Sequence, residues 1–421
     1  MNTNTLAIDH NHSKTVDWIL AVIFVVSHIL QSITSFIPGI SYGELALGIC
    51  LGAAILFYGL SDIRISRLNA DMLIYFSICL SISLCVSLVL YPFSMYDFTI
   101  RIIRWFFYIF CSLVLSANIK LNILEKILVV AAIVIAGLLL IQVFIFHAYG
   151  RVIYFSINKT ILGASIERFA VFGSSRKTIV RFSSLFSEPA HFAYFETLAL
   201  VLVLFRKQPK EFTFSDIATV FLITLSLVFS SSSYALLLLF VIFLIFVSKI
   251  LIESKSKRSI VFILLFLSIC IALFLFMRST MLYSYATSKL LAFGKTNRST
   301  FAWNRSLDFT PLQKIFGVGI GNEENFVRHT FGLELPYNNS PSLAFMYCGF
   351  VGVTLMQIYF ILNVVRLKNV SRIILILFWV ISTFSTAFFS PAMILYNVVI
   401  SLICSKNTLG ESIDEKTIRI Q

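Results

Sequence analysis

Long runs of apolar residues follow one another along the chain, and short polar stretches separate them. A membrane-spanning helix needs about 20 consecutive apolar residues. The runs are continuous, which disfavours a transmembrane β-barrel, because barrel strands alternate apolar and polar positions. The pattern predicts about twelve transmembrane helices, at residues 18–37, 42–60, 72–91, 98–117, 127–147, 189–205, 216–230, 233–252, 259–277, 341–365, 372–389 and 391–404.

Composition supports this interpretation and excludes other classes of protein. Of the 421 residues 58% are hydrophobic and 13% are charged, and the mean hydropathy is +0.92. A soluble domain carries about 25% charged residues, so an ordinary soluble protein is excluded. The 43 Phe residues also exclude intrinsic disorder. We therefore expect an all-α polytopic integral membrane protein, with residues 1–421 forming a single membrane domain.

Lys and Arg residues set the orientation of these helices, because short cytoplasmic loops carry an excess of both. With the N-terminus in the cytoplasm, most basic residues of the short loops fall on the cytoplasmic side, and Arg101 and Arg104 are the exceptions. An even number of helices places the C-terminus in the cytoplasm too. Charges within predicted helices, such as Glu44 and Glu196, are functional candidates by default.

Two long external loops, at about 148–189 and 278–338, contain more basic than acidic residues. Long loops are translocated regardless of charge, and in a compact fold they are usually functional. We interpret the net charge of +13 as orienting charge together with a site for an anion. We find no nucleic-acid-binding motif, and the seven Cys and six His residues show no metal-site spacing. The sequence predicts neither a metal nor a cofactor.

The first long loop ends in a group of residues that could carry chemistry. Arg181 is followed by Glu188, Pro189 and His191. Pro189 suits the first turn of a helix, which places Glu188 at its N-terminus and allows Glu188 and His191 to share a face. The functional interpretation is a carboxylate or imidazole base at the membrane surface beside Arg181. The alternative is a capping Glu and an interfacial His.

The second long loop contains Arg298, Trp303, Arg305 and Arg328. Arg298 and Arg305 are seven residues apart, so they share a face if this stretch is helical. Guanidinium groups bind phosphate oxygens in a bidentate way that Lys cannot match. Trp303 could stack on a sugar ring, and its alternative is a place in the aromatic belt at the membrane interface.

A glycine-rich turn follows in the same loop, with Gly317, Gly319 and Gly321 within five residues. Such a turn could present backbone N–H groups to an anion. It is not a Walker loop, because no Gly-Lys-Ser/Thr follows. A plain structural turn is the alternative.

These features occur together in a known family. The chain resembles the O-antigen polymerase and O-antigen ligase superfamily of bacterial envelope glycosyltransferases. Four features carry the resemblance and cover most of the chain: Arg181 to Glu188-Pro189 before a helix, the Ser230–Ser233 turn with Tyr234, the glycine turn at 316–321, and Tyr337-x-Asn339 followed after nine residues by Gly349-x-x-Gly352. The ligases have a His at the position of Tyr337, so this departure favours a polymerase.

The resemblance implies a function, a location and partners. It implies polymerisation of undecaprenyl-pyrophosphate-linked oligosaccharide repeat units at the periplasmic face of the bacterial inner membrane, with a chain-length regulator as a further partner. It also makes both long loops periplasmic. The alternatives are an O-antigen ligase, which transfers polymer to lipid A-core, and a flippase or transporter for the same lipid-linked sugar.

Developing charge on the departing pyrophosphate can be stabilised by Arg side chains, and a base must activate the acceptor hydroxyl. We therefore expect the arginines to bind the pyrophosphates, Glu188 and His191 to supply the base, and the remaining residues to position the substrate. The predicted catalytic residues are Arg181, Glu188, His191 and Arg305, and the predicted substrate-binding residues are Arg298, Trp303, Gly319, Arg328, Tyr337 and Asn339.

Overall fold

The computed structural model describes residues 3–31, 33, 35–37, 39–60, 65–90, 95–150, 153, 155, 182–186, 188–206, 211–253, 302, 304–332 and 338–418. The regular elements assigned within these ranges are α-helices and short 3-10 helices, with no strand. The prediction of an all-helical fold is confirmed for this part of the chain. The described elements are α1 (Thr3–Ile29), α2 (Tyr42–Tyr58), α3 (Arg67–Leu90), α4 (Met95–Asn118), α5 (Leu121–Tyr149), α7 (Pro189–Arg206), α8 (Phe214–Phe229), α9 (Ser233–Glu253), η3 (Ser306–Asp308), α13 (Pro311–Phe316), α14 (Glu323–Phe331), α15 (Ser340–Arg366), α16 (Asn369–Phe384), η4 (Ala387–Phe389) and α17 (Ala392–Ile418).

Many of these helices have the length or composition of membrane helices. Among the described residues, five helices are long and apolar enough to cross a membrane, and they belong to α3, α4, α5, α7 and α15. Shorter apolar helices lie in α2, α8, α9, α16 and α17. Each predicted run contains or overlaps a described helix, except 259–277, which lies outside the described residues. The structure is thus that of a helical, multi-pass membrane protein, and the count of twelve spans stays a prediction.

Two compact units make up the chain, and each is discontinuous in sequence. The first contains residues 1–50 and 120–291, and the second contains residues 51–119 and 292–421. The single membrane domain expected over residues 1–421 stays a prediction.

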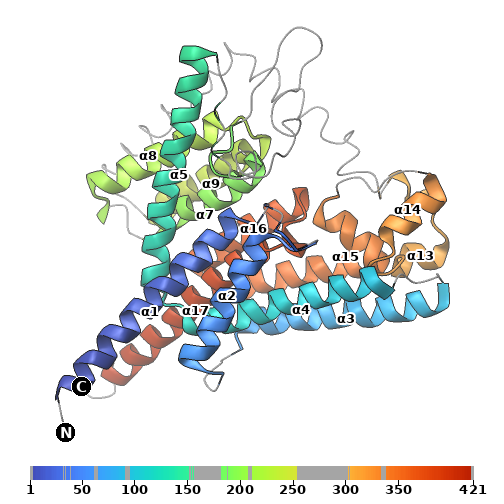
Figure 1. The fold of residues 1–421 in the computed structure, drawn as a ribbon, viewed down its shortest axis with the longest axis horizontal. Helices are drawn as coiled ribbons and strands as arrows, with labels where there is room; N and C mark the ends of the chain where they lie inside the picture. The colour runs from blue at the N-terminus through green and yellow to red at the C-terminus, as the bar shows by residue number, and fades with distance from the viewer. Residues whose placement is uncertain are drawn as a thin grey trace. The chain divides into compact units, whose positions relative to one another are not determined.

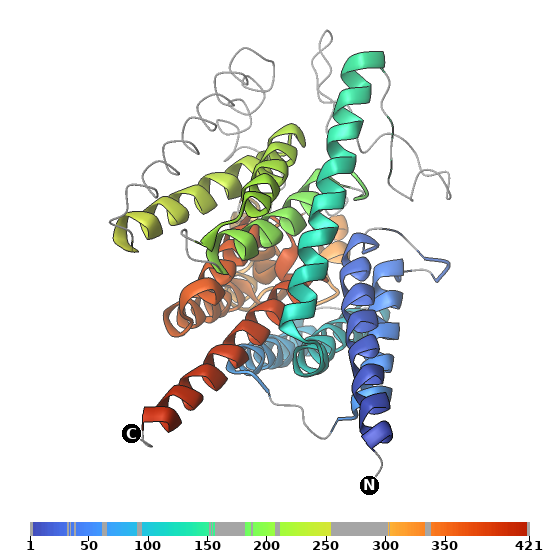
Figure 2. The same ribbon diagram turned by 90° about the vertical axis from the view of Figure 1, so that its left-hand side faces the viewer.

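In the first unit, the long helix α5 packs against α1, α7 and α8, and α7 also packs against α9 (Figures 1 and 2). Helix α8 begins with a capping box, in which Thr213 and Asp216 each accept a backbone N–H of the other residue. It ends at Phe229, and Ser231 has a φ of 54°. The serine-rich segment is therefore a turn between two helices and not a kink within one.

In the second unit, α3 and α4 pack along each other, α15 packs on α3, and α17 packs on α4. Helices α13 and α14 lie at the end of this pair where α3 ends and α4 begins (Figure 1). Helix α15 is broken at Cys348 and Gly349, whose backbone angles are not helical. The predicted run 341–365 is thus two helical pieces joined by a break.

The predicted run 372–389 is also shorter as a helix than expected. Helix α16 ends at Phe384, and η4 follows before α17 begins. The C=O group of Ser385 accepts hydrogen bonds from both the N–H and the hydroxyl of Ser340, each at 2.7 Å. These two bonds attach the C-terminal end of α16 to the start of α15.

Candidate functional site

The segment that precedes α7 is held on the first unit by buried hydrogen bonds. The Ser184 N–H donates to Gln142 Oε1 at 3.0 Å, and the Ser184 hydroxyl donates to the Ile135 C=O at 2.7 Å. The Phe182 N–H donates to the Ser230 C=O at 3.3 Å. The structure therefore brings two of the four features of the resemblance together: the stretch before Glu188 and the serine turn. Arg181 itself lies outside the described residues.

Glu188 and His191 lie at the start of α7, as the sequence predicts. The Glu188 C=O accepts the Phe192 N–H at 3.3 Å, which places Glu188 just outside the helix, where the helix dipole favours a carboxylate. The Glu188 carboxylate interacts electrostatically with His191. The His191 ring packs edge-on to Tyr194, and Tyr194 packs in the same way on Tyr234, which follows the serine turn. A carboxylate, an imidazole and two phenol rings are thus gathered at one end of α7.

His191 Nδ1 is buried and has no hydrogen-bond partner among the described residues. An imidazole nitrogen left without a partner is available to accept or donate a proton, which a general base requires. Deeper in the same helix, Glu196 is 0% exposed, and neither of its carboxylate oxygens has a partner among the described residues. Such a buried intramembrane acid is a functional candidate, as the sequence already indicated.

In the second unit, Arg305 and Arg328 present exposed guanidinium groups. Arg305 is 46% exposed and lies 3.6 Å from Asp308, and Arg328 is 61% exposed and lies 3.2 Å from Glu324. The Arg305 guanidinium also lies over the ring of Phe331, 5.1 Å from its centroid. Exposed ion pairs of this kind contribute little to stability, so either arginine can exchange its local carboxylate for a phosphate.

Phe331 ends the helix that carries Arg328, so the two arginines are linked through α14. Helix α14 is anchored by Phe326, whose ring packs edge-on to Phe309, and Phe309 stacks on Phe345 of α15. The predicted partners Arg298, Trp303 and Tyr337 lie outside the described residues.

The glycine turn uses its backbone N–H groups within the protein. Val318 and Gly319 donate to the C=O groups of Met346 and Tyr347, and the Ile320 N–H donates to the Ser83 hydroxyl. These N–H groups are therefore not available to a substrate anion. The geometry favours the structural turn over the anion-binding turn for Gly319.

Asn339 is likewise engaged by its neighbours. Its side chain accepts the Ser342 N–H at 2.9 Å as the N-cap of α15, and its amide donates to the Thr383 C=O at 2.9 Å. Asn339 is 7% exposed. In this structure it fixes the start of α15, and its role in positioning the substrate stays a prediction.

A buried charge cluster that sequence reasoning did not assign lies beside the glycine turn. Arg101 of α4 lies 2.5 Å from Glu323, the first residue of α14, and donates to the Tyr347 hydroxyl at 3.1 Å. Burial raises the pKa of Glu323 above its ordinary value, and the positive charge of Arg101 opposes this rise. One signal was available in the sequence, because Arg101 was an exception to the charge bias of the loops.

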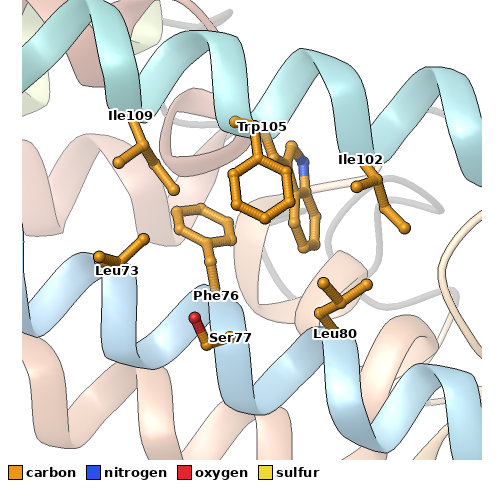
Figure 3. Close-up of a pocket in the computed structure, with 8 residues that line it drawn as sticks. Leu73, Phe76, Ser77, Leu80, Ile102, Trp105 and Ile109 are labelled. Atoms are coloured by element: carbon orange, nitrogen blue, oxygen red, sulfur yellow. The ribbon is translucent and has the colours of Figure 1, made fainter.

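An apolar groove between α3 and α4 lies near this cluster (Figure 3). Phe76 and Trp105 face each other in it, with ring centroids 4.6 Å apart. Trp105 also contacts the Tyr347 ring, which connects the groove to the charge cluster. The described residues that line the groove include no charged one, so this lining does not suit a pyrophosphate. Its lining residues are Leu73, Phe76, Ser77, Leu80, Ile102, Trp105, Phe106 and Ile109.

The described residues contain no group of three or more His, Cys, Asp or Glu residues placed to hold a metal ion. No protein-family model, no curated protein and no solved structure matches the chain. Assignment of a function therefore depends on the residues themselves.

Proposed function

We propose that this protein is a glycosyltransferase that polymerises undecaprenyl-pyrophosphate-linked oligosaccharide repeat units at the periplasmic face of the bacterial inner membrane. The observation that carries the proposal is the exposure of Arg305 and Arg328 on a segment attached to membrane helices. Only 13% of the residues in the chain are charged, so two exposed guanidinium groups on this segment indicate a ligand for them. An anionic lipid headgroup is a ligand that such groups bind well.

The reaction needs no group beyond the two lipid-linked substrates. A sugar hydroxyl of one repeat unit attacks the anomeric carbon of the chain on the other lipid, and the bond from that carbon to the pyrophosphate oxygen breaks. The electron pair of this bond leaves with the lipid pyrophosphate, whose growing charge Arg305 and Arg328 stabilise. A general base takes the proton of the hydroxyl, the role that the sequence predicts for Glu188 or His191.

The test is reconstitution of the purified full-length protein with lipid-pyrophosphate-linked repeat units as sole substrate. We expect a ladder of lengthening products on a gel. We expect Arg305→Ala and Arg328→Ala each to shorten or abolish it, because one lost donor of this kind costs about 2.7–4 kcal/mol. Arg366→Ala is the matched control, because Arg366 is also 46% exposed and pairs with Asp71 near the start of α3, whereas the segment that carries Arg305 and Arg328 is attached near the end of α3, at Ser83 and Ser87. No ladder from the folded wild type would refute the proposal.

Transport of the same lipid-linked sugar is a second candidate, favoured by the break in α15. Discontinuous membrane helices are common at the substrate sites of transporters. In this chain the C=O groups of Met346 and Tyr347, just before the break, already accept backbone N–H groups of the glycine turn, so the break does not present these groups to a cavity. A flux assay in vesicles separates the two functions, since a transporter moves the lipid-linked sugar without lengthening it.

A further inference from the structure

The segment of residues 304–332, called here the arginine segment, is attached to the membrane helices of its unit by three joints. The first joint is between backbones. The N–H groups of Val318 and Gly319 donate to the C=O groups of Met346 and Tyr347 at 2.8 and 3.2 Å. These carbonyls lie directly before the break in α15, where a helix leaves C=O groups without intrahelical partners. The glycine turn thus supplies the donors that the broken helix lacks.

Close packing at this joint requires glycine. A Cβ atom at Gly317 would lie 2.6 Å from the Cys348 nitrogen, and one at Gly349 would lie 2.3 Å from the Ile315 oxygen. Both glycines also have positive φ angles, of 79° and 61°, which disfavour a side chain. The register between the arginine segment and α15 is therefore closely fixed.

The second joint connects the glycine turn to α3. Ser83 accepts the Ile320 N–H, and Ser87 accepts a hydrogen bond from the Asn322 amide at 3.2 Å. The N-terminal end of α14 is thereby fixed to the end of α3 as well as to α15.

The third joint is the charge cluster. Arg101 projects from α4, pairs with Glu323 of α14 at 2.5 Å, and donates to the hydroxyl of Tyr347 of α15 at 3.1 Å. One guanidinium group therefore links three helices. Asp97 also acts electrostatically on both Arg101 and Glu323, so the cluster carries two carboxylates against one guanidinium and does not suit an anion.

Glu323 cannot act on a substrate directly, because its side chain is 0% exposed. It begins α14, and five residues later the same helix carries Arg328. Phe331, over which the Arg305 guanidinium lies, ends the helix. The orientation of α14 at Glu323 therefore sets the position of both exposed guanidinium groups.

We infer that Arg101 and Glu323 are positioning residues for Arg305 and Arg328, and through them for the pyrophosphate of the lipid-linked substrate. The inference rests on the proposed function. A misplacement of catalytic groups by about 1 Å costs about 100-fold in rate, so loosening this joint reduces activity even when the protein stays folded. The competing explanation is an ion pair that serves stability alone.

The variants Glu323→Gln and Arg101→Lys test the inference in the full-length protein reconstituted in liposomes. Gln keeps the shape of Glu323 and removes its charge, and Lys keeps the charge of Arg101 without its forked geometry. Asp71→Asn is the matched control, because it removes the partner of Arg366 from another ion pair of the same unit, with a separation of 2.6 Å. Three quantities are measured: kcat and KM for chain lengthening, melting temperature, and hydrogen exchange at the Val318 and Gly319 N–H groups.

We expect Glu323→Gln to lower kcat/KM about 10- to 100-fold, with faster exchange at both N–H groups and a melting temperature close to that of the wild type. We expect the kcat/KM of Arg101→Lys to lie between those of Glu323→Gln and the wild type. We expect Asp71→Asn to match the wild type in all three quantities. A wild-type kcat/KM in Glu323→Gln would overturn the inference. So would a loss of kcat/KM that Asp71→Asn shares, or a loss without faster hydrogen exchange at the Val318 and Gly319 N–H groups. Absence of a ladder from the wild type would instead refute the proposed function, and the inference with it.

Discussion

Replacing Arg101 with Met is expected to destabilise the protein strongly at neutral pH and weakly at acidic pH. Met keeps much of the volume of Arg and removes its charge, while Glu323 stays at 0% exposure. Breaking a buried ion pair from one side costs about 3–5 kcal/mol. Glu323 avoids this cost by binding a proton, which for a Glu of ordinary pKa costs about 3.7 kcal/mol at pH 7. Because burial already raises the pKa of Glu323 in the wild type, protonation costs less than that and limits the loss in the free energy of unfolding to less than about 3.7 kcal/mol.

The pH dependence of this loss follows from the pKa of Glu323. Burial raises that pKa above its ordinary value even beside Arg101, and removal of Arg101 raises it further. At pH values between the ordinary and the raised pKa, Glu323 keeps its proton in the folded protein, whereas the unfolded chain has released it. The free energy of unfolding therefore falls as pH rises through this window, by up to about 1.4 kcal/mol per pH unit. The loss in the free energy of unfolding of Arg101→Met relative to the wild type, called here the deficit, is small near pH 4 and larger at pH 7.

Unfolding in mixed micelles with increasing SDS, followed by Trp fluorescence at both pH values, measures this deficit. Glu323→Gln is the control, because it leaves behind Arg101, which is 33% exposed and can be hydrated. We expect that variant to change the free energy of unfolding by less than about 1 kcal/mol. We expect the double variant to recover most of the stability that Arg101→Met loses. Equal losses in the two single variants, or a loss in Arg101→Met that does not change with pH, would refute this account of the cluster.

Three further substitutions, two of them with a comparison variant, test the packing within each unit through thermal melting in detergent. Gly349→Ala is expected to lower the free energy of unfolding by at least about 1–2 kcal/mol, because the φ of Gly349 is 61° and the new Cβ meets backbone atoms. Gly137→Ala is its control. A Cβ atom at Gly137 has nothing within 4 Å, so this change is expected to leave the stability unchanged or to raise it. Asn339→Ala is expected to lose about 0.5–2 kcal/mol with the N-cap of α15, and Asn339→Asp, which keeps the capping oxygen, should recover part of it. Gln142→Leu is expected to lose about 1–3 kcal/mol, because it leaves the buried Ser184 N–H without its acceptor, and unchanged stability would contradict the role given to that bond.

Apolar run length predicted most of the described helices, because a segment that crosses a bilayer must satisfy its backbone internally and stay apolar over its length. The same criterion could not predict the break in α15. The residues on both sides of Gly349 are as apolar as a continuous helix requires, and the donors that stabilise the break come from the glycine turn, about thirty residues earlier. A pattern read along one segment does not reveal partners supplied by another.

The candidate site was predicted unevenly for the same reason. Glu188 and His191 are candidates because residues three apart on a helix are neighbours. Arg305 and Arg328 are candidates because charge is rare in this chain. The hydrogen bond that fixes Ser184 to Gln142 joins residues 42 positions apart, and no local spacing indicates it.

Arg101 lies on the predicted external side, against the excess of Lys and Arg expected in cytoplasmic loops. The charge bias of loops orients membrane proteins, so a basic residue on the predicted external side needs another reason to be there. Here that reason is Glu323, a buried acid 222 positions away in sequence, with which the partly exposed Arg101 forms an ion pair. The ion pair gives Arg101 a structural role on that side, while the count of Lys and Arg that predicts the orientation is unchanged, because acidic residues contribute little to the bias. In a membrane protein with so few charges, each basic residue that violates the bias is therefore a reason to look for a buried acid on the same side.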